Sequence, residues 1–232
     1  MGKFINNIIT IFTNSKYLGT IANGLKLTFV ISLGAAVLGL FLGTLVAIVK
    51  LSSPKNKWMV VPRFIANVYV TVIRGTPMAL QLFIMAFVIF VYRGFPTTIK
   101  AILAFGINSG AYVAENIRAG ILSVDIGQTE AGRSLGLSGR VTMIRIVIPQ
   151  AIKNVIPAIG NELIALIKET SIVNMIGMYD LTAAAYNIAS GKNLANFLAP
   201  MTVASVFYLA IVYSLALLIK VIERRLRASD KR

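Results

Sequence analysis

The sequence predicts an all-α integral membrane protein built as a bundle of five transmembrane helices. Hydrophobic residues make up 57% of the 232 residues, charged residues only 13%, and the mean hydropathy is +0.80. A soluble domain carries about 25% charged residues. Charge-poor segments long enough to cross ~30 Å of hydrocarbon, which takes about 20 helical residues, recur along the chain. The composition therefore excludes an ordinary soluble domain.

Polar or charged segments separate the expected spans, which cover residues 27–49, 75–92, 101–122, 150–167 and 197–219. Pro77 is expected to kink or restart the second of them, and the sequence leaves open whether residues 64–92 form one bent helix or two pieces. The mixed residues 170–195 predict a loop with one or two short helices. Gly34, Gly39 and Gly43 in the first span predict close helix packing.

The domain organisation follows from this pattern. Residues 20–226 are expected to form the transmembrane domain, and residues 227–232 a basic tail. Residues 1–19 alternate apolar with polar side chains, which fits either an interfacial amphipathic helix or a partly ordered tail.

The distribution of positive charge predicts the orientation of the bundle. With the C-terminus inside, 16 of the 23 Lys and Arg residues fall in cytoplasmic segments and 7 in outer segments. The positive-inside rule then places the N-terminus outside. The formal net charge of +15 does not form one stripe, so nucleic acid is not an expected partner. Cys and His are absent, so neither a disulfide framework nor a thiol or imidazole metal site is expected.

A polar island between the third and fourth spans, which this orientation places inside the cell, predicts a docking element. Asp125 is suited to cap a short helix over about 126–136, and Gly136 stands where a helix end favours the left-handed conformation. Glu130 and Arg133, three residues apart, are expected to pair on one exposed face. Ser138 is expected to cap a second helix that enters the membrane.

The same island resembles the EAA signature of the membrane subunits of bacterial ABC importers. That signature reads Glu-Ala-Ala, three residues, Gly, nine residues and Ile-x-Leu-Pro. Here Gly132 replaces the third small residue and Ile148 replaces Leu. The matching positions are Glu130, Ala131, Gly136, Ile146 and Pro149. Residues 24–28, 74–77, 110–118, 161–162 and 168–171 resemble the polar amino-acid branch of the family, which includes histidine, glutamine and arginine permeases.

The resemblance implies a type I permease subunit that is not itself an enzyme. Its short coupling helix would seat in a cleft of a separate ATPase subunit, which would bind ATP and Mg. This chain has no P-loop sequence of its own. The expected coupling residues are Glu130, Ala131, Gly132, Arg133, Leu135 and Gly136. A second permease subunit, identical or homologous, and an extracellular or periplasmic solute-binding protein would complete the importer in the bacterial plasma membrane.

Acidic residues inside the spans are the candidates for substrate contact, because buried charge in a bilayer is costly. Glu162 would lie roughly 16 Å into the fourth span, and Glu115 roughly 21 Å into the third. Glu162 either binds a substrate amino or cationic group, forms a structural ion pair, or is protonated. Asn161 precedes it, and Glu169 either extends an acidic path or belongs to a solvated exit turn. Glu115 is expected to pair with Arg118.

Arg74 either receives a carboxylate or, as we favour, anchors the break in the second span against carbonyl groups. The acidic candidates mildly favour a cationic amino acid such as arginine, lysine or histidine, or else glutamine. The alternative is an ion-gradient-driven amino-acid transporter or channel without an ATPase. Its sign would be an acidic path without a cytoplasmic docking helix.

Overall fold

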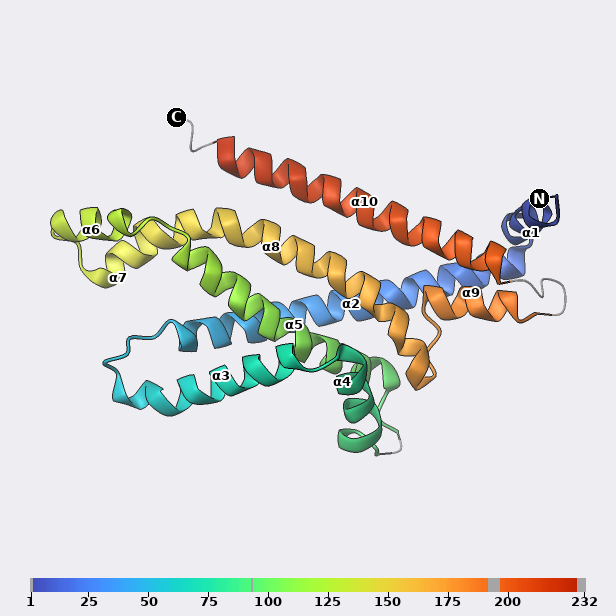
Figure 1. Ribbon diagram of the computed structural model, residues 1–232, viewed down its shortest axis with the longest axis horizontal. Helices are drawn as coiled ribbons and strands as arrows, with labels where there is room; N and C mark the ends of the chain where they lie inside the picture. The colour runs from blue at the N-terminus through green and yellow to red at the C-terminus, as the bar shows by residue number, and fades with distance from the viewer. Residues whose placement is uncertain (1, 93, 192–196, 229–232) are drawn as a thin grey trace. The chain divides into compact units, whose positions relative to one another are not determined.

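The computed structural model describes residues 2–92, 94–191 and 197–228, in which helices joined by turns and loops occur but no β-strand (Figure 1). The all-α class predicted from the sequence is thus confirmed. The α-helices are α1 (Gly2–Thr13), α2 (Ser15–Lys50), α3 (Val60–Gly75), α4 (Met78–Ile84), α5 (Thr97–Leu122), α6 (Ile126–Ser134), α7 (Gly139–Thr142), α8 (Ile148–Glu169), α9 (Leu181–Ala189) and α10 (Leu198–Ala228). Two 3₁₀ segments, η1 (Lys57–Met59) and η4 (Thr170–Ile176), and two π segments, η2 (Met85–Ile89) and η3 (Met143–Val147), complete the set.

Three helical segments in the described residues are long and apolar enough to cross a membrane. They are Ser15–Lys50, Gly139–Ile176 and Leu198–Leu226. A fourth span results if Lys57–Gly75 and Met78–Ile89 count as one broken crossing. The break lies at Thr76 and Pro77, both of which have extended backbone conformations. Residues 64–92 are therefore two helical pieces, as Pro77 makes possible.

Helix α5, the expected third span, does not belong to that apolar set. The fully or nearly fully buried side chains of Ala101, Phe105, Ala111 and Ala114 lie along its length. Protein rather than lipid surrounds these positions, so α5 tolerates the polar Asn108, which is also buried. The low hydropathy of α5 thus reflects its place in the protein interior.

The chain divides into two compact units. Unit 1 comprises residues 1–36, 77–105 and 163–215, and unit 2 comprises residues 37–76, 106–162 and 216–232. Helices α2, α5, α8 and α10 each contribute residues to both units. The basic tail expected at 227–232 falls largely on residues 229–232, which lie outside the described part of the chain.

Unit 1 contains two apolar clusters. One gathers Ile31, Leu82 and Phe105 with residues of η4, and the other joins α1, α2, α9 and α10 through Ile11, Ile21, Leu181 and Val203. Residues 2–13 are thus helical, with Ile11 fully buried, and the helix ends before Asn14, whose side chain accepts a hydrogen bond from the Lys16 N–H (2.9 Å). Residues 170–191 contain two short helices, η4 and α9, in agreement with expectation.

Unit 2 is held together by close contacts between α2 and α5. A Cβ atom added at Gly39 would lie 2.8 Å from Ser109, and one at Gly43 would lie 2.6 Å from Val113. Gly34 makes the equivalent approach to Ile102 within unit 1 (2.9 Å). The close packing predicted for these glycines is therefore confirmed. Tyr69 of α3 adds a hydrogen bond from its hydroxyl to the Ile107 carbonyl of α5 (2.5 Å).

Candidate functional site

Helix α6, in unit 2, has caps at both ends that its own sequence supplies. The Asp125 side chain accepts a hydrogen bond from the Gly127 N–H (2.6 Å). At the other end, the Gly136 N–H bonds to the Arg133 carbonyl (3.0 Å) and the Leu137 N–H to the Gly132 carbonyl (3.1 Å). This is a Schellman motif, and it requires the left-handed conformation that Gly136 adopts (φ 80°). Both predicted caps are present.

The next helix starts as expected, with Ser138 accepting a hydrogen bond from the Val141 N–H (3.3 Å). It then passes through the π segment η3, where the Ile148 N–H bonds to the carbonyl of Met143, five residues back. Pro149 explains this widening, because a proline lacks the N–H for the Arg145 carbonyl and its ring would clash with that group. The proline of the signature thus shapes the passage from α7 into α8.

Two of the expected coupling residues, Gly132 and Arg133, make contacts within this segment. Gly132 is the buried residue of α6, and a Cβ atom there would lie 2.8 Å from Thr142 Cγ2. Gly132 therefore allows α6 and the helix that starts at Gly139 to approach each other closely, and it is buried between them. Arg133 donates to the Leu137 carbonyl (2.7 Å) rather than pairing with Glu130, because the glycine turn brings that carbonyl within reach.

Glu130 and Ala131 of α6 are exposed, and an exposed apolar side chain lies near each end of the helix. Leu135 is 80% exposed and Ile126 is 73% exposed. The sequence reasoning selected Leu135 but missed Ile126. A lone isoleucine beside the Asp125 cap, in an otherwise polar segment, was the available signal.

Side-chain hydrogen bonds tie the base of α6 to α8 within unit 2. Gln150 donates to the Gln128 side chain (3.2 Å), and Asn154 donates to the Ser123 hydroxyl (2.9 Å). Below them, α5 and α8 approach closely at Gly120, where a Cβ atom would lie 2.3 Å from Val155. Helix α6 is therefore tied to α8, which itself packs on α5.

Glu115 lies in a three-residue ion cluster of unit 2. One carboxylate oxygen pairs with the Lys50 ammonium, and the other accepts hydrogen bonds from Arg118 Nε (3.0 Å) and Nη2 (2.9 Å). The Glu115 and Lys50 side chains are largely buried, at 15% and 12% exposure. The predicted pair with Arg118 is thus present. Lys50 was missed because it is 65 residues away in the sequence.

The other predicted substrate residues are divided between the two units. Asn161 is exposed and Glu162 is half-buried, both in unit 2, whereas Glu169 is half-buried in unit 1. Two residues before Glu162, α10 packs closely on α8, since a Cβ atom at Gly160 would lie 2.7 Å from Ile219. Arg74 lies with its guanidinium carbon 5.1 Å from the centre of the Tyr112 ring. This contact is a cation–π interaction, where we had expected backbone carbonyl partners.

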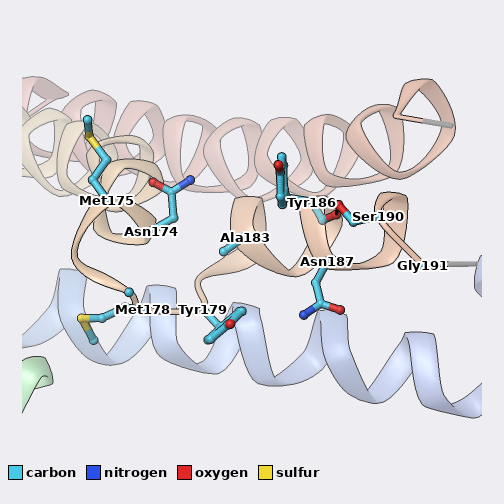
Figure 2. A pocket seen from close by; sticks show the side chains of 10 residues that line it. Asn174, Met175, Met178, Tyr179, Ala183, Tyr186, Asn187, Ser190 and Gly191 are labelled. Carbon is cyan, nitrogen blue, oxygen red and sulfur yellow. Dashed lines mark hydrogen bonds between the residues drawn. The ribbon is translucent and has the colours of Figure 1, made fainter. Parts of the chain in front are cut away.

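A cavity of about 660 Å³ lies in unit 1, where the end of η4, the following turn and α9 meet. Figure 2 shows that Asn174 and Met175, then Tyr179, then Tyr186, Asn187 and Ser190 line it in chain order. Among the described residues its lining contains amide, hydroxyl, aromatic and thioether groups but no acidic side chain. It therefore lacks the acidic chemistry that the sequence predicted for a substrate site.

The long apolar helices and the fold define a helical membrane protein, and comparison with known sequences identifies its family. Residues 51–228 match the family described as "Binding-protein-dependent transport system inner membrane component". The chain belongs to this family and is a permease subunit of an ABC amino-acid importer.

Among its relatives, the arginine transport system permease protein ArtQ of Bacillus subtilis is 39% identical over 90% of this chain and 94% of that protein. A putative glutamine transport system permease protein GlnP of Rickettsia typhi is 38% identical over 89% of this chain and 92% of its own length. The L-cystine transport system permease protein TcyB of Bacillus subtilis is 35% identical over 89% and 86%, respectively.

Solved structures show the same fold. A chain from a structure described as "Crystal structure of an amino acid ABC transporter with histidines" has a TM-score of 0.82 and 38% identity, covering 90% of this chain and 95% of that one. An inward-facing MetNI methionine ABC transporter chain has a TM-score of 0.74 over 92% and 99%, respectively. At 17% identity, this second likeness concerns the fold alone.

Proposed function

We propose that this chain forms half of the translocation path of an ATP-driven importer for polar amino acids, and that α6 is where the ATPase subunit holds it. The observation that carries the proposal is the exposure of Glu130 within α6 and of the apolar Ile126 and Leu135 at its two ends. Apolar side chains on a short, capped and anchored helix are typical of an interface core. The close contact of Gly132 with Thr142 supports the same role, because a displacement of α6 would also displace α7, to which Thr142 belongs.

The proposed membrane topology has five spans, with α5 as the interior one, the N-terminus outside and α6 inside the cell. The positive-inside charge count supports it. The ATPase subunits, which bind ATP and Mg, then dock from the cytoplasm. A solute-binding protein delivers substrate from outside, and a second permease subunit completes the path.

The proposed substrate is a polar amino acid, with a mild preference for cationic ones. Relatives named as arginine and glutamine permeases support the class. Within this chain, Glu162 is the candidate for contact with a substrate amino or guanidinium group, because its expected depth of roughly 16 Å lies near the middle of the bilayer. Both carboxylate oxygens of Glu115 already have cationic partners, so we assign Glu115 a structural role. We place Asn161 beside Glu162 in the substrate site and Glu169 nearer the outer end of the path.

The coupling role is tested by co-purification with the ATPase subunit. Glu130→Lys and Leu135→Asp should each abolish co-elution and ATP-dependent uptake, because both alter the exposed face of α6. Ile5→Asp is the matched control, since Ile5 is a half-exposed apolar residue on α1 (51%) and should leave the complex intact. Retention of the ATPase by both α6 variants would overturn the proposal, and so would uptake into liposomes without ATP.

The substrate role is tested by binding of labelled arginine and glutamine to the purified complex. Glu162→Gln should weaken arginine binding by about tenfold or more, as expected for loss of one charge-assisted contact. Glutamine binding should change less, because its side chain is neutral. Equal affinities in Glu162→Gln and the parent protein would remove Glu162 from the site while leaving the permease assignment in place.

A further inference from the structure

An apolar groove of about 530 Å³ lies between α2 and α3 in unit 2. Four side chains from Leu42 to Val49 on α2 face four from Pro62 to Tyr69 on α3, at the spacing of one helix face on each side. The Tyr69 hydroxyl is turned away to the Ile107 carbonyl, so the ring faces the groove while its polar end is satisfied. The groove therefore offers hydrocarbon contact and no hydrogen-bonding partner.

The volume and shape of the groove fit a chain-like apolar ligand. Its volume lies within the range of about 300–1,000 Å³ typical of small-molecule sites. Leu42 to Val49 spans about 10 Å of helix, so the groove is elongated along α2. In a helical hairpin of a membrane protein, the apolar chain available to fill such a groove is a lipid acyl chain.

The connection that closes the hairpin at one end of the groove is strongly basic. Lys55 and Lys57 are exposed there, and no acidic residue occurs between Lys50 and Arg74. Trp58, in η1, is 92% exposed, and tryptophan favours the headgroup level of a bilayer. The same end of the hairpin thus combines positive charge with an interfacial aromatic residue.

This connection has a defined conformation. The Asn56 side chain accepts a hydrogen bond from the Trp58 N–H (3.1 Å) and so caps η1. Arg63 reaches back from α3, with Nε donating to the Met59 carbonyl (3.1 Å) and Nη2 to the Pro54 carbonyl (3.4 Å). Arg63 is therefore used to shape the connection, which leaves Lys55 and Lys57 as the cations for a ligand.

We propose that the α2–α3 hairpin is a binding site for an anionic phospholipid. One acyl chain fills the groove between Leu42–Val49 and Pro62–Tyr69, and the headgroup phosphate is held by Lys55 and Lys57 beside Trp58. Basic pockets next to apolar helices are a recognised arrangement for anionic lipid headgroups. The site needs only that α2 and α3 lie in the bilayer, and the proposed orientation assigns it to the cytoplasmic leaflet. Its test does not depend on transport.

The first experiment measures the lipid that stays bound to the full-length permease in its complex after extensive detergent washing, by lipid mass spectrometry. The parent protein should retain phosphatidylglycerol or cardiolipin in preference to zwitterionic lipid. Lys55→Glu with Lys57→Glu should lower this retention by about tenfold or more, given a gain of roughly fivefold for each lysine near an anionic surface. Lys3→Glu with Lys16→Glu changes the net charge equally and should retain the lipid.

The second pair of variants separates the groove from simple charge attraction. Leu45→Trp places a large side chain in the groove, whereas Val68→Trp changes a similarly exposed position (47% and 44%) that does not line it. Leu45→Trp should lose the retained anionic lipid and Val68→Trp should keep it. If the lysine variant loses lipid but Leu45→Trp does not, attraction to the basic connection explains the binding and the groove site is overturned.

Trp58 provides an independent readout because it is the chain's single tryptophan. In vesicles of phosphatidylcholine containing brominated phosphatidylglycerol, Trp58 should be quenched several-fold more than with brominated phosphatidylcholine at the same fraction. The Trp58→Phe complex supplies the background from other subunits. Equal quenching by the two lipids would overturn the proposal. The chain has no cysteine, so a disulfide between two Leu45→Cys chains would also overturn it by showing a second permease over the groove.

Discussion

Helices α6 and α9 have the same length, nine residues, and each begins after an aspartate that caps it. Asp125 is exposed and accepts one backbone N–H, that of Gly127. Asp180 is fully buried and accepts the N–H groups of Thr182 and Ala183 as well as the Tyr208 hydroxyl (2.9 Å).

The bodies of the two helices differ as much as their caps. In α9 six of the nine residues are buried, whereas α6 has one buried residue, Gly132. The same local signal therefore starts both helices, and the residues that follow decide their use. Small and aliphatic side chains make α9 part of the core of unit 1, and polar ones leave α6 on the surface of unit 2. Six substitutions test this contrast.

The largest difference in stability is expected between the two caps. Asp180→Ala removes two capped N–H groups and leaves the Tyr208 hydroxyl without its buried charged acceptor, which should lower the free energy of unfolding by about 3 kcal/mol. Asp125→Ala removes one exposed cap and should cost about 1 kcal/mol or less. Thermal unfolding of the purified complex measures both. Equal losses would show that burial does not distinguish the two helices.

The next largest difference in stability is expected at two glycines, Gly24, which packs against α9, and Gly132, which lies in α6. A Cβ atom at Gly24 would lie 2.8 Å from the Asp180 carbonyl oxygen and 2.9 Å from Ala184, so Gly24→Ala presses on α9 where the backbone cannot yield. We expect a loss of about 2 kcal/mol. Gly132→Ala meets the Thr142 side chain instead, and alanine also favours the helix by about 1 kcal/mol, so the net loss should be about 1 kcal/mol. The reverse order in thermal unfolding would contradict this explanation.

A smaller effect is expected for Tyr208→Phe. The change removes one hydrogen bond to Asp180 and a contact with the Thr182 hydroxyl (3.2 Å), and keeps the ring in place. The free energy of unfolding should fall by about 1–2 kcal/mol, less than in Asp180→Ala, because both backbone caps remain. A double-mutant cycle with Asp180→Ala measures the coupling. Additive effects would mean that Tyr208 does not support the cap.

The smallest change in stability is expected for Leu135→Ser on α6. Leu135 is 80% exposed, so its removal should alter the free energy of unfolding by no more than about 0.5 kcal/mol. Under the proposed function the same change should sharply reduce the ATPase activity of the assembled transporter, because the ATPase subunit would lose contact with α6. Unfolding and ATPase assays on one preparation separate the two effects. A destabilised Leu135→Ser protein would mean that α6 packs within the subunit as α9 does.

The parts of this fold that the sequence could predict are those set by neighbours in the chain. The Asp125 and Ser138 caps and the turn at Gly136 each depend on hydrogen bonds across two to five residues, and each was recognised. The apolar spans were recognised for a similar reason, since a helix that crosses a bilayer needs a long continuous run of apolar residues.

The parts that the sequence could not predict depend on partners far along the chain. Lys50 reaches Glu115 only after α2 packs on α5, and Asp180 meets Tyr208 only after α10 folds back. The inward turn of Gly132 depends on the path of the following helix, which the π segment alters. The positions of the candidate substrate residues in the sequence did not indicate that both carboxylate oxygens of Glu115 would pair with cations. They also did not indicate that Asn161 would be exposed.

The wide turn at Met143–Val147 fixes the rotational phase of the helix that follows it. Each residue advances an α-helix by about 100°, so one residue removed from this segment would swing every later side chain of unit 2 on α8 around the axis by that angle. Glu162 would then face another neighbour, although no residue near it had changed. The number of residues in this segment, more than which residues they are, therefore sets how the side chains of α8 are rotated relative to α6.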